Sequence, residues 1–363
     1  MANLSSGEFL LKDLSLGVLE AQDVSQAIFQ QVLEVGDIAT HHEVHTGIDY
    51  DTQIPFIGTL GLVGKKILKC KPDANGSQIP VSQKKWTPVL IGDRFENCAV
   101  DANPLFKLFK AAQKINPDFF NKVGSEEEGV VMLRVEQAMR EMLQRIAWFG
   151  DKTIDTFANG SYLTNGTDPL FFNMLDGFWK QIISIDIPTT SKFYVPISQN
   201  TTATYALQEV LPTDFAFNLF RKMYKKSDSR FKQLIGKGMK VCIHCTPEIA
   251  ENWTDYREDK SLIFTLDKVE TGGMRNAFRN IEIVPRYDWA ATIQSYQDNG
   301  TTLHLPHRAL MTTPENIPVG TVSTEDLQKL LSFYDPYHEV NVMDFRLKFD
   351  AKFLEDYLAV AAY

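Results

Sequence analysis

One long amphipathic segment, residues 125–149, constrains the fold of this chain more than any other part of its sequence. It opens with a capping box, in which Ser125 and Glu128 each accept a hydrogen bond from a backbone N–H at the helix start. Gly150 follows the segment and is a common helix terminator. Its apolar residues fall on one helix face: Val131, Val135, Ala138, Met139, Met142 and Ile146. At about 1.5 Å per residue such a helix is roughly 37 Å long and can form the spine of a domain.

Shorter segments with helical and strand patterns make up much of the remaining chain. Three further helices are predicted, at residues 23–35, 168–184 and 213–226. Thr213 and Asp214 are suitable caps for the last of them. Residues 343–349 alternate apolar with charged side chains, which is the pattern of a half-buried strand. We therefore predict an α+β fold in which one long helix packs with strands from distant parts of the chain.

Residues 54–100 carry the pattern of a β-hairpin. The dipeptide Asn75-Gly76 lies between an apolar run at residues 67–68 and a second run at residues 86–91, and this arrangement is a strong hairpin signal. Several lysines make the stretch unusually basic for a core hairpin: Lys65, Lys66, Lys69, Lys71, Lys84 and Lys85. We expect an arm that projects from the body of the protein.

The charge balance and the distribution of apolar residues exclude several classes of protein. The chain has 363 residues, and its 37 basic and 46 acidic side chains give a net charge of −9. This charge argues against a protein whose main work is to grip nucleic-acid phosphates. No apolar run approaches about 18 residues and no secretory signal pattern begins the chain, so we expect no membrane contact. Four cysteines fit a reducing compartment.

The segment KVCIHCTPEI, residues 240–249, raises the question of a metal or redox site. It contains three residues of the types that zinc accepts: Cys242, His244 and Cys245. A closed zinc site needs four ligands, and the remaining cysteines, Cys70 and Cys98, each stand alone. We therefore favour a structural role for the pair over a metal or thiol role.

The residues on either side of this pair indicate a strand followed by a helix. Alternating apolar residues predict a half-buried strand: Met239, Val241 and Ile243. Thr246 and Pro247 are suitable for the N-cap and first position of a helix that continues through Trp253. The two cysteines are thus expected to straddle a turn between strand and helix.

Two other segments resemble functional motifs without satisfying them. GTLGLVGKK, residues 58–66, has Thr59 where a phosphate-binding loop needs glycine and Lys66 where it needs a hydroxyl. HHEVH, residues 41–45, has His42 where the zinc metalloprotease helix needs its glutamate. Neither segment predicts an active site.

A basic run with interleaved aromatic residues, FRKMYKKSDSRFK, occupies residues 220–232. It fits a nucleic-acid contact through lysine pairing and ring stacking, and it fits a solvated helix face equally well. Taken with the motifs above, the sequence gives no catalytic, cofactor-binding or metal-binding residue.

Three segments near the carboxyl terminus resemble a known family. They are RNIEIVPRYDW (279–289), LPHRALMTTPENIPVGT (305–321) and MDFRLKFDAKFLEDYLAVAAY (343–363). Together they resemble the ends of major capsid proteins of tailed bacteriophages with the Hong Kong 97-type fold, particularly those of phages that infect Bacteroidetes-like hosts.

The resemblance implies a division of the chain into four parts. These are an amino-terminal arm (1–54), an extended β-hairpin loop (55–100), a peripheral domain (101–160 and 302–363) with its spine helix at 125–149, and an axial domain (161–301). In this division KVCIHCTPEI falls on an axial-domain strand and the start of the following helix, which favours the structural interpretation of its cysteines.

The resemblance also implies a function. A protein of this family is not an enzyme and needs no cofactor; it self-assembles into hexamers and pentamers of an icosahedral phage head around double-stranded DNA, in the host bacterial cytoplasm, and becomes part of the virion. Expected partners are the portal, possible decoration proteins and a separate scaffolding protein, since no coiled-coil-like segment precedes the arm. The lysine and asparagine that some members cross-link are not identifiable in this sequence.

Two alternatives remain open from the sequence. An encapsulin-type nanocompartment shell has the same expected fold but holds a cargo enzyme in place of DNA. A cytoplasmic metal- or thiol-dependent enzyme would instead use Cys242, His244 or the 41–45 cluster.

Overall fold

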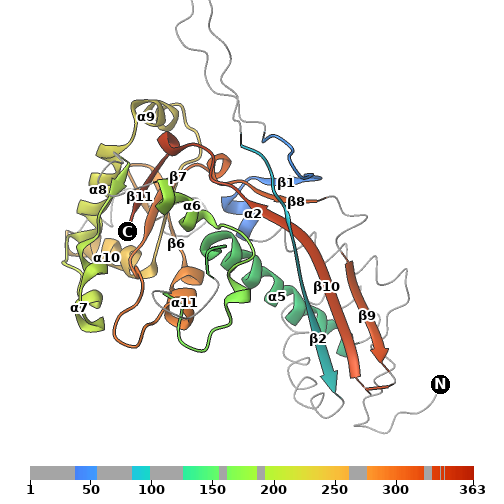
Figure 1. The fold of residues 1–363 in the computed structure, drawn as a ribbon. Helices are drawn as coiled ribbons and strands as arrows, with labels where there is room; N and C mark the ends of the chain where they lie inside the picture. Colours follow the sequence, from blue (N-terminus) through green and yellow to red (C-terminus); the bar gives the residue numbers. More distant parts are fainter. Residues whose placement is uncertain are drawn as a thin grey trace, which may run out of the picture.

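The computed structural model shows two β-sheets with helices packed around and between them (Figure 1). It describes residues 37–54, 84–98, 126–154, 162–185, 193–260, 276–322, 329–335, 337–338 and 340–363. The predicted helix at 23–35 and the Asn75-Gly76 hairpin tip lie outside the described residues. None of the described helices is both long and apolar enough to cross a membrane.

Within the described residues the first sheet has five strands and is built around one long strand, β10 (Val340–Ala351). β10 pairs antiparallel with β2, β8 and β9, and β1 adds to β8 in parallel. The four partners are β1 (Val44–Thr46), β2 (Val89–Cys98), β8 (Val319–Thr321) and β9 (Lys329–Asp335). Figure 1 shows β2, β9 and β10 as an extended sheet that reaches away from the body of the molecule.

The predicted strand at 343–349 is confirmed as part of β10, and its alternating pattern explains how it is oriented. Phe345, Leu347 and Phe349 are almost fully buried, whereas Arg346 is exposed. Because successive side chains of a strand point to opposite faces, the three apolar residues share the face that packs on the core. Polar residues on the other face leave it open to solvent.

The predicted spine helix is confirmed as α5 (Glu126–Phe149). Four of the predicted apolar positions are buried: Val135, Met139, Met142 and Ile146. They pack in the same core as Phe345, Leu347 and Phe349 of β10. Ser125 and the side chains of residues 126–134, which include Glu128 and Val131, lie outside the described part of the chain.

The prediction of the apolar stripe is wrong for one residue, Ala138. Ala138 is exposed, and Leu143 is buried in its place. The two positions lie on opposite margins of the stripe centred on Met139 and Ile146. Since burying a large side chain removes more apolar surface from water than burying a methyl group, the helix turns toward Leu143.

The end of α5 is fixed by a close approach of two backbone segments. The N–H of Gly177 donates to the carbonyl of Gly150 at 2.8 Å, and the N–H of Asp151 donates to the carbonyl of Phe172 at the same distance. A Cβ on Gly177 would lie 2.7 Å from the Gly150 nitrogen, so a larger residue cannot occupy this position without moving the backbone. The contact ties α5 to the segment that starts the next helix.

The predicted helix at 168–184 is interrupted at this contact. The structure has a short 3-10 helix, η3 (Pro169–Phe171), followed by α6 (Phe178–Ile185). Asp168 caps η3 by accepting from the N–H of Leu170. The residues between the two helices follow the path required by the Gly150–Gly177 contact.

In the part of the chain that the structure describes, the second sheet has six strands in the order β3-β11-β7-β4-β6-β5. The strands are β3 (Tyr194–Val195), β4 (Cys242–Cys245), β5 (Ala277–Phe278), β6 (Ile281–Pro285), β7 (Ala309–Thr312) and β11 (Ala359–Ala362). Five helices accompany them: α7 (Tyr205–Glu209), α8 (Phe215–Lys226), α9 (Ser229–Gly236), α10 (Pro247–Asp259) and α11 (Tyr287–Tyr296). The predicted helix at 213–226 thus begins at Phe215, with Asp214 at its N-cap.

The central strands of this sheet are covered on both faces. In β11, Ala359 and Ala361 belong to the core around α5, while Val360 and Ala362 belong to a second core under α8 and α10. This alternation follows from the two-residue period of a strand. The second sheet therefore separates two apolar cores and is in contact with both.

Strands from distant parts of the chain pair within both sheets. β2 includes part of the second predicted hairpin run, and its described partner is β10. The stretch 302–363, predicted to lie in one peripheral unit, supplies β8, β9 and β10 to the first sheet but β7 and β11 to the second. Local patterns identify strands, but pairing between distant strands leaves no local signal.

Introducing the same charge at two adjacent positions of α5 tests how the helix is oriented. Met139→Asp places a carboxylate in the core, where Met139 is 1% exposed, so it should cost several kcal/mol of unfolding free energy. Ala138→Asp changes an exposed position and should cost about 1 kcal/mol or less, mainly through helix propensity. Thermal unfolding of the unassembled subunit measures both, and equal losses would contradict the orientation described here.

Candidate functional site: a buried histidine cluster where the two sheets meet

The structure brings together two of the segments that resemble metal motifs. His41 and His42, from the end of α2 (Asp37–His41) and the residue after it, lie against His244 of β4. Ring centroids are 5.4 Å apart for His41 and His244 and 6.5 Å apart for His42 and His244. All three side chains are buried. We call these three residues the histidine cluster.

Local structure explains why each histidine faces inward. The His42 N–H donates to the Ile38 carbonyl at 2.9 Å and closes the last turn of α2. The His42 ring is held by a 2.9 Å hydrogen bond between Nδ1 and the Ile317 carbonyl. In the HHEVH segment only His41 lies in the helix, while His45 lies in β1 and pairs with Glu43 at 3.5 Å. The segment therefore lacks the geometry of a metalloprotease helix.

Aromatic side chains from three helices enclose the cluster. Phe178 of α6 stacks on His42 with centroids 5.2 Å apart. Trp148 at the end of α5 lies 5.4 Å from the His42 ring and 5.7 Å from the His244 ring. Trp289 of α11 completes the enclosure at 6.4 Å from His244. The histidines are thus packed as flat, largely apolar groups within the core.

The electrostatic environment keeps His42 and His244 neutral. Burial, with a further contribution from the positive charge of Arg286, lowers the pKa of His42 to about 3. The same two causes, in the same order, lower the pKa of His244 well below its usual value. Arg286 itself is buried but pairs with Asp288 through two hydrogen bonds, at 2.7 and 2.9 Å. A proton added to His42 or His244 would therefore be buried and close to the positive charge of Arg286.

The cysteines of the CIHC segment are placed where they cannot act together. Both Cys242 and Cys245 lie within β4 and are buried, so the prediction that they straddle the turn is wrong; the turn starts at Thr246. The strand is also buried at every residue and not half-buried as predicted. Cys245 points with Ile243 into the core under α8 and α10, and an odd sequence separation directs Cys242 to the opposite face.

The chemistry available to these thiols is limited by burial. Burial, and secondarily the charge of Glu248, raises the pKa of the Cys245 thiol strongly, so the reactive thiolate is disfavoured. Within the described ranges, no three histidine, cysteine, aspartate or glutamate side chains are arranged to hold a metal ion. Cys70 lies outside those ranges, as does the side chain of Cys98.

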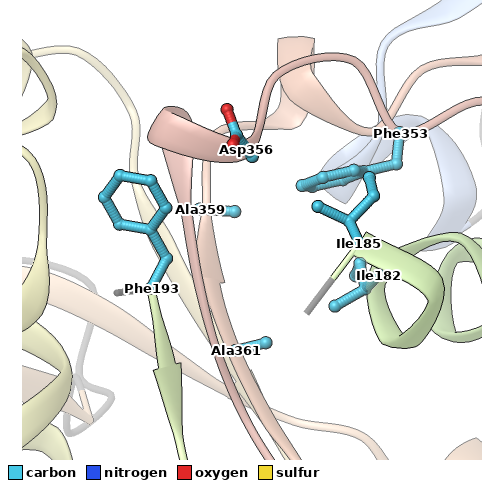
Figure 2. Close-up of a pocket in the computed structure, with 7 residues that line it drawn as sticks. All are labelled: Ile182, Ile185, Phe193, Phe353, Asp356, Ala359 and Ala361. Atoms are coloured by element: carbon cyan, nitrogen blue, oxygen red, sulfur yellow. The ribbon is translucent and has the colours of Figure 1, made fainter. Parts of the chain in front are cut away.

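An apolar recess between α6 and the carboxyl-terminal segment is too small to be a ligand site (Figure 2). Figure 2 shows Ile182 and Phe353 on one side of it and Phe193 on the other, with Ala361 on the strand between them. Its volume is about 10 Å³. A cavity of this size can hold about one water molecule at most, so the recess is a packing imperfection of the core.

The sequence did not reveal the residues that surround the histidine cluster. Trp148, Phe178 and Trp289 come from three helices that are far apart in the chain, and Arg286 lies at the start of α11. The local sequence around each of them is common in helices, because each is an apolar residue at helical spacing or a charged residue near a helix end. Only the three-dimensional contacts distinguish them.

Comparisons with known proteins relate the fold to phage shells. No protein-family model and no curated protein sequence matches the chain. A chain of the satellite phage P4 procapsid, solved with its size determination (Sid) protein, is similar with a TM-score of 0.52 and 10% identity, over 93% of this chain and 98% of that chain. A chain from Gordonia phage Cozz gives 0.45 and 12%, over 90% and 85%. The holo-SrpI encapsulin complex of Synechococcus elongatus gives 0.44 and 8%, over 88% and 84%.

The match to the P4 procapsid chain extends over nearly the whole length of both chains. The protein described here therefore has the fold of that procapsid chain. The predicted fold class, an α+β chain of the Hong Kong 97 type, is confirmed.

The unassembled subunit is expected to lose stability in acid through the histidine cluster. The folded-state pKa of His42 lies below its ordinary value of 6.5. The stability that neutral His42 gives to the folded state is therefore fully present above about pH 6.5 and is lost as the pH falls toward 3. His42→Asn keeps a donor for the Ile317 carbonyl but cannot take up a proton. Below about pH 6 the variant should lose up to about 1.4 kcal/mol less per pH unit than the wild type. Urea unfolding at stepped pH measures this slope, and equal slopes would contradict the buried, neutral state of His42.

Replacing both cysteines of β4 tests whether they hold a metal. Cys242→Ser with Cys245→Ser should cost about 1 to 3 kcal/mol, because the hydroxyl at position 245 would enter an apolar core. The corresponding alanine pair should cost less, since it buries no new polar group. Elemental analysis should find no stoichiometric zinc in the wild type, and a chelator should leave its melting temperature unchanged. A chelator effect present in the wild type and absent from the alanine pair would revive the metal interpretation.

Proposed function

We propose that this protein is the major capsid subunit of a tailed bacteriophage. In this role it assembles with copies of itself into hexamers and pentamers of an icosahedral head that encloses double-stranded DNA. It works as a structural component of the virion and not as an enzyme. The observation that carries the proposal is the fold shared with the P4 procapsid chain along 93% of this chain and 98% of that one.

The shape of the molecule supports a role in a shell. The extended sheet of β2, β9 and β10 reaches away from the body of the molecule (Figure 1). Large apolar side chains remain exposed on it and elsewhere, including Leu90 of β2 at 55% and Val210 after α7 at 68%. A monomer gains little stability from exposed apolar side chains, whereas contacts with neighbouring subunits would cover these surfaces.

The charge of the chain suits a container for DNA. With a net charge of −9, the subunit attracts the DNA backbone weakly as a whole, which leaves packaged DNA free to move and to be released. The candidate sites described above also give no reason to assign catalysis, because the histidine cluster and the described cysteines are buried.

Several finer features belong to the same proposal. Residues 1–54 form the amino-terminal arm, 55–100 the extended loop, 101–160 with 302–363 the peripheral domain, and 161–301 the axial domain. The portal, a separate scaffolding protein and possible decoration proteins are the further partners. Assembly takes place in the cytoplasm of the bacterial host, and the resemblance of the carboxyl-terminal segments points to a Bacteroidetes-like host.

Expression of the protein should yield closed, regular particles, and deletion of residues 73–77 should prevent their closure. The deletion removes the tip of the proposed extended loop, where chain shortening is generally tolerated by the fold. Negative-stain electron microscopy measures particle formation, and circular dichroism with thermal unfolding measures whether the shortened subunit still folds. A folded subunit without closed particles is the expected result.

Each part of this experiment has a result that contradicts a different claim. A wild-type protein that stays monomeric at all concentrations and with phage scaffolding proteins present contradicts the capsid proposal. Wild-type yield of closed particles from the deletion variant contradicts the role of the loop alone. Particles from infected or producing cells that contain a cargo enzyme in place of nuclease-protected DNA would identify an encapsulin-type shell.

A further inference from the structure

A second pocket, separate from the recess of Figure 2, contains a buried positive charge. Its volume is about 190 Å³, and it lies between the end of α5, the helix α6 and the residues that follow α11. The polar residues that line it are Asp151, Tyr162, Lys180, Gln297, His304 and Arg308. The site is thus large enough for several water molecules or for a small polar group.

Arg308 is held firmly by neutral groups. It is 2% exposed, and its Nε donates to the Leu305 carbonyl at 2.8 Å. One terminal nitrogen, Nη2, donates to the side-chain oxygen of Gln297 at 2.9 Å and to the His304 carbonyl at 3.0 Å. The other terminal nitrogen, Nη1, makes no hydrogen bond with any residue of the described ranges. Burial lowers the pKa of Arg308 to about 10, which leaves the guanidinium charged at neutral pH.

The absence of a counter-ion separates Arg308 from the other fully buried arginine. Arg286, also 2% exposed, makes a two-point ion pair with Asp288 at 2.7 Å. No carboxylate in the described ranges forms an ion pair with Arg308. The Arg308 guanidinium lies over the rings of Phe149 and Trp179, at 5.1 and 5.4 Å from their centroids, but these neutral contacts supply no negative charge. Since a buried charge is strongly disfavoured unless it is paired, the pocket favours an added anion.

The remaining polar groups of the pocket do not supply that anion. The Asp151 carboxylate accepts from Lys180 at 3.0 Å, so these two charges neutralise each other. Tyr162 stacks on His304 with ring centroids 4.4 Å apart and directs its hydroxyl to Asp151 at 3.3 Å. Burial and the charge of Arg308 hold His304 in the neutral form by lowering its pKa to about 3. The lining therefore has one positive charge in excess.

We propose that this pocket binds a carboxylate group, with Nη1 of Arg308 and the side-chain amide nitrogen of Gln297 as its donors. A guanidinium suits a planar carboxylate because its N–H groups lie in one plane. The amide nitrogen of Gln297 has no acceptor among the described residues, and the amide oxygen is already oriented by Arg308. The carboxylate comes either from a small free acid or from an acidic side chain of a second copy of the chain.

Gln297→Glu tests the proposal by building the missing carboxylate into the protein. The new side chain has the same shape, and its carboxylate would lie where the amide now contacts Arg308 at 2.9 Å. The variant should melt roughly 2 to 4 °C above the wild type. Acetate, added in place of chloride at constant ionic strength, should raise the melting temperature of the wild type and have no effect on the variant.

Gln208→Glu is the matched control. Gln208 is equally buried, at 2% exposure, but both its amide atoms are paired, with the N–H and the carbonyl of Leu303 at 2.9 Å each. This variant loses a donor and gains no partner, so it should melt below the wild type and keep the acetate response. The proposal is overturned if Gln297→Glu melts no higher than the wild type, or if it responds to acetate as the wild type does.

An assembly measurement distinguishes the two sources of the carboxylate. If a second copy supplies it, acetate at constant ionic strength and the Gln297→Glu change should each reduce particle formation by folded subunits. If a free acid supplies it, Gln297→Glu should assemble as the wild type does, and assembled wild-type particles should keep the acetate response. The melting experiments use unassembled subunits, so their result stands apart from the proposed capsid function. Failure of the wild type to assemble would count against that function alone.

Discussion

The whole fold depends on the burial of one helix end, the last turn of α5, against both sheets. Trp148 in that turn is fully buried, and it packs on Trp289 at 4.6 Å and on Phe178 at 4.9 Å between ring centroids. Rings in such edge-to-face contacts contribute beyond the area they bury. Because the contact includes α11 and His244 of the second sheet, the direction of α5 is fixed relative to that sheet. The extended sheet packs along the same helix, so its direction relative to the second sheet is fixed as well.

The carboxyl-terminal segment strengthens this connection by running through both sheets. It forms β10 in the first sheet and, after η7 (Asp356–Leu358), forms β11 between β3 and β7 of the second. The chain then ends at Tyr363, whose ring contacts Trp179 of α6 and whose backbone carbonyl accepts from the Tyr194 hydroxyl at 2.9 Å. The body and the extended sheet are therefore linked by one continuous segment as well as by packing.

The sequence predicted the elements that depend on local side-chain pattern and capping, and it missed the contacts between distant segments. The length and period of α5, the alternation of β10 and the helix start at Thr246 all follow from side-chain pattern and capping, and all three are present. The exposure of Ala138 and the pairing of β2 with β10 depend on packing between distant segments. The histidine cluster was also out of reach, because His41 and His42 lie at the end of α2 whereas His244 lies in β4, far along the chain.

The motif-like segments show why residue type alone predicts chemistry poorly. A zinc or thiol site needs side chains that converge, and the strand conformation of β4 sends Cys242 and Cys245 to opposite faces. A metalloprotease helix needs its histidines on one helix face, and here the helix ends at His41. His244 and His42 do meet, yet they meet in an enclosure of aromatic rings beside a paired arginine, where neither takes up a proton. Backbone direction and solvent access thus decide the chemistry of these residues. In this fold both place the residues in packed core positions.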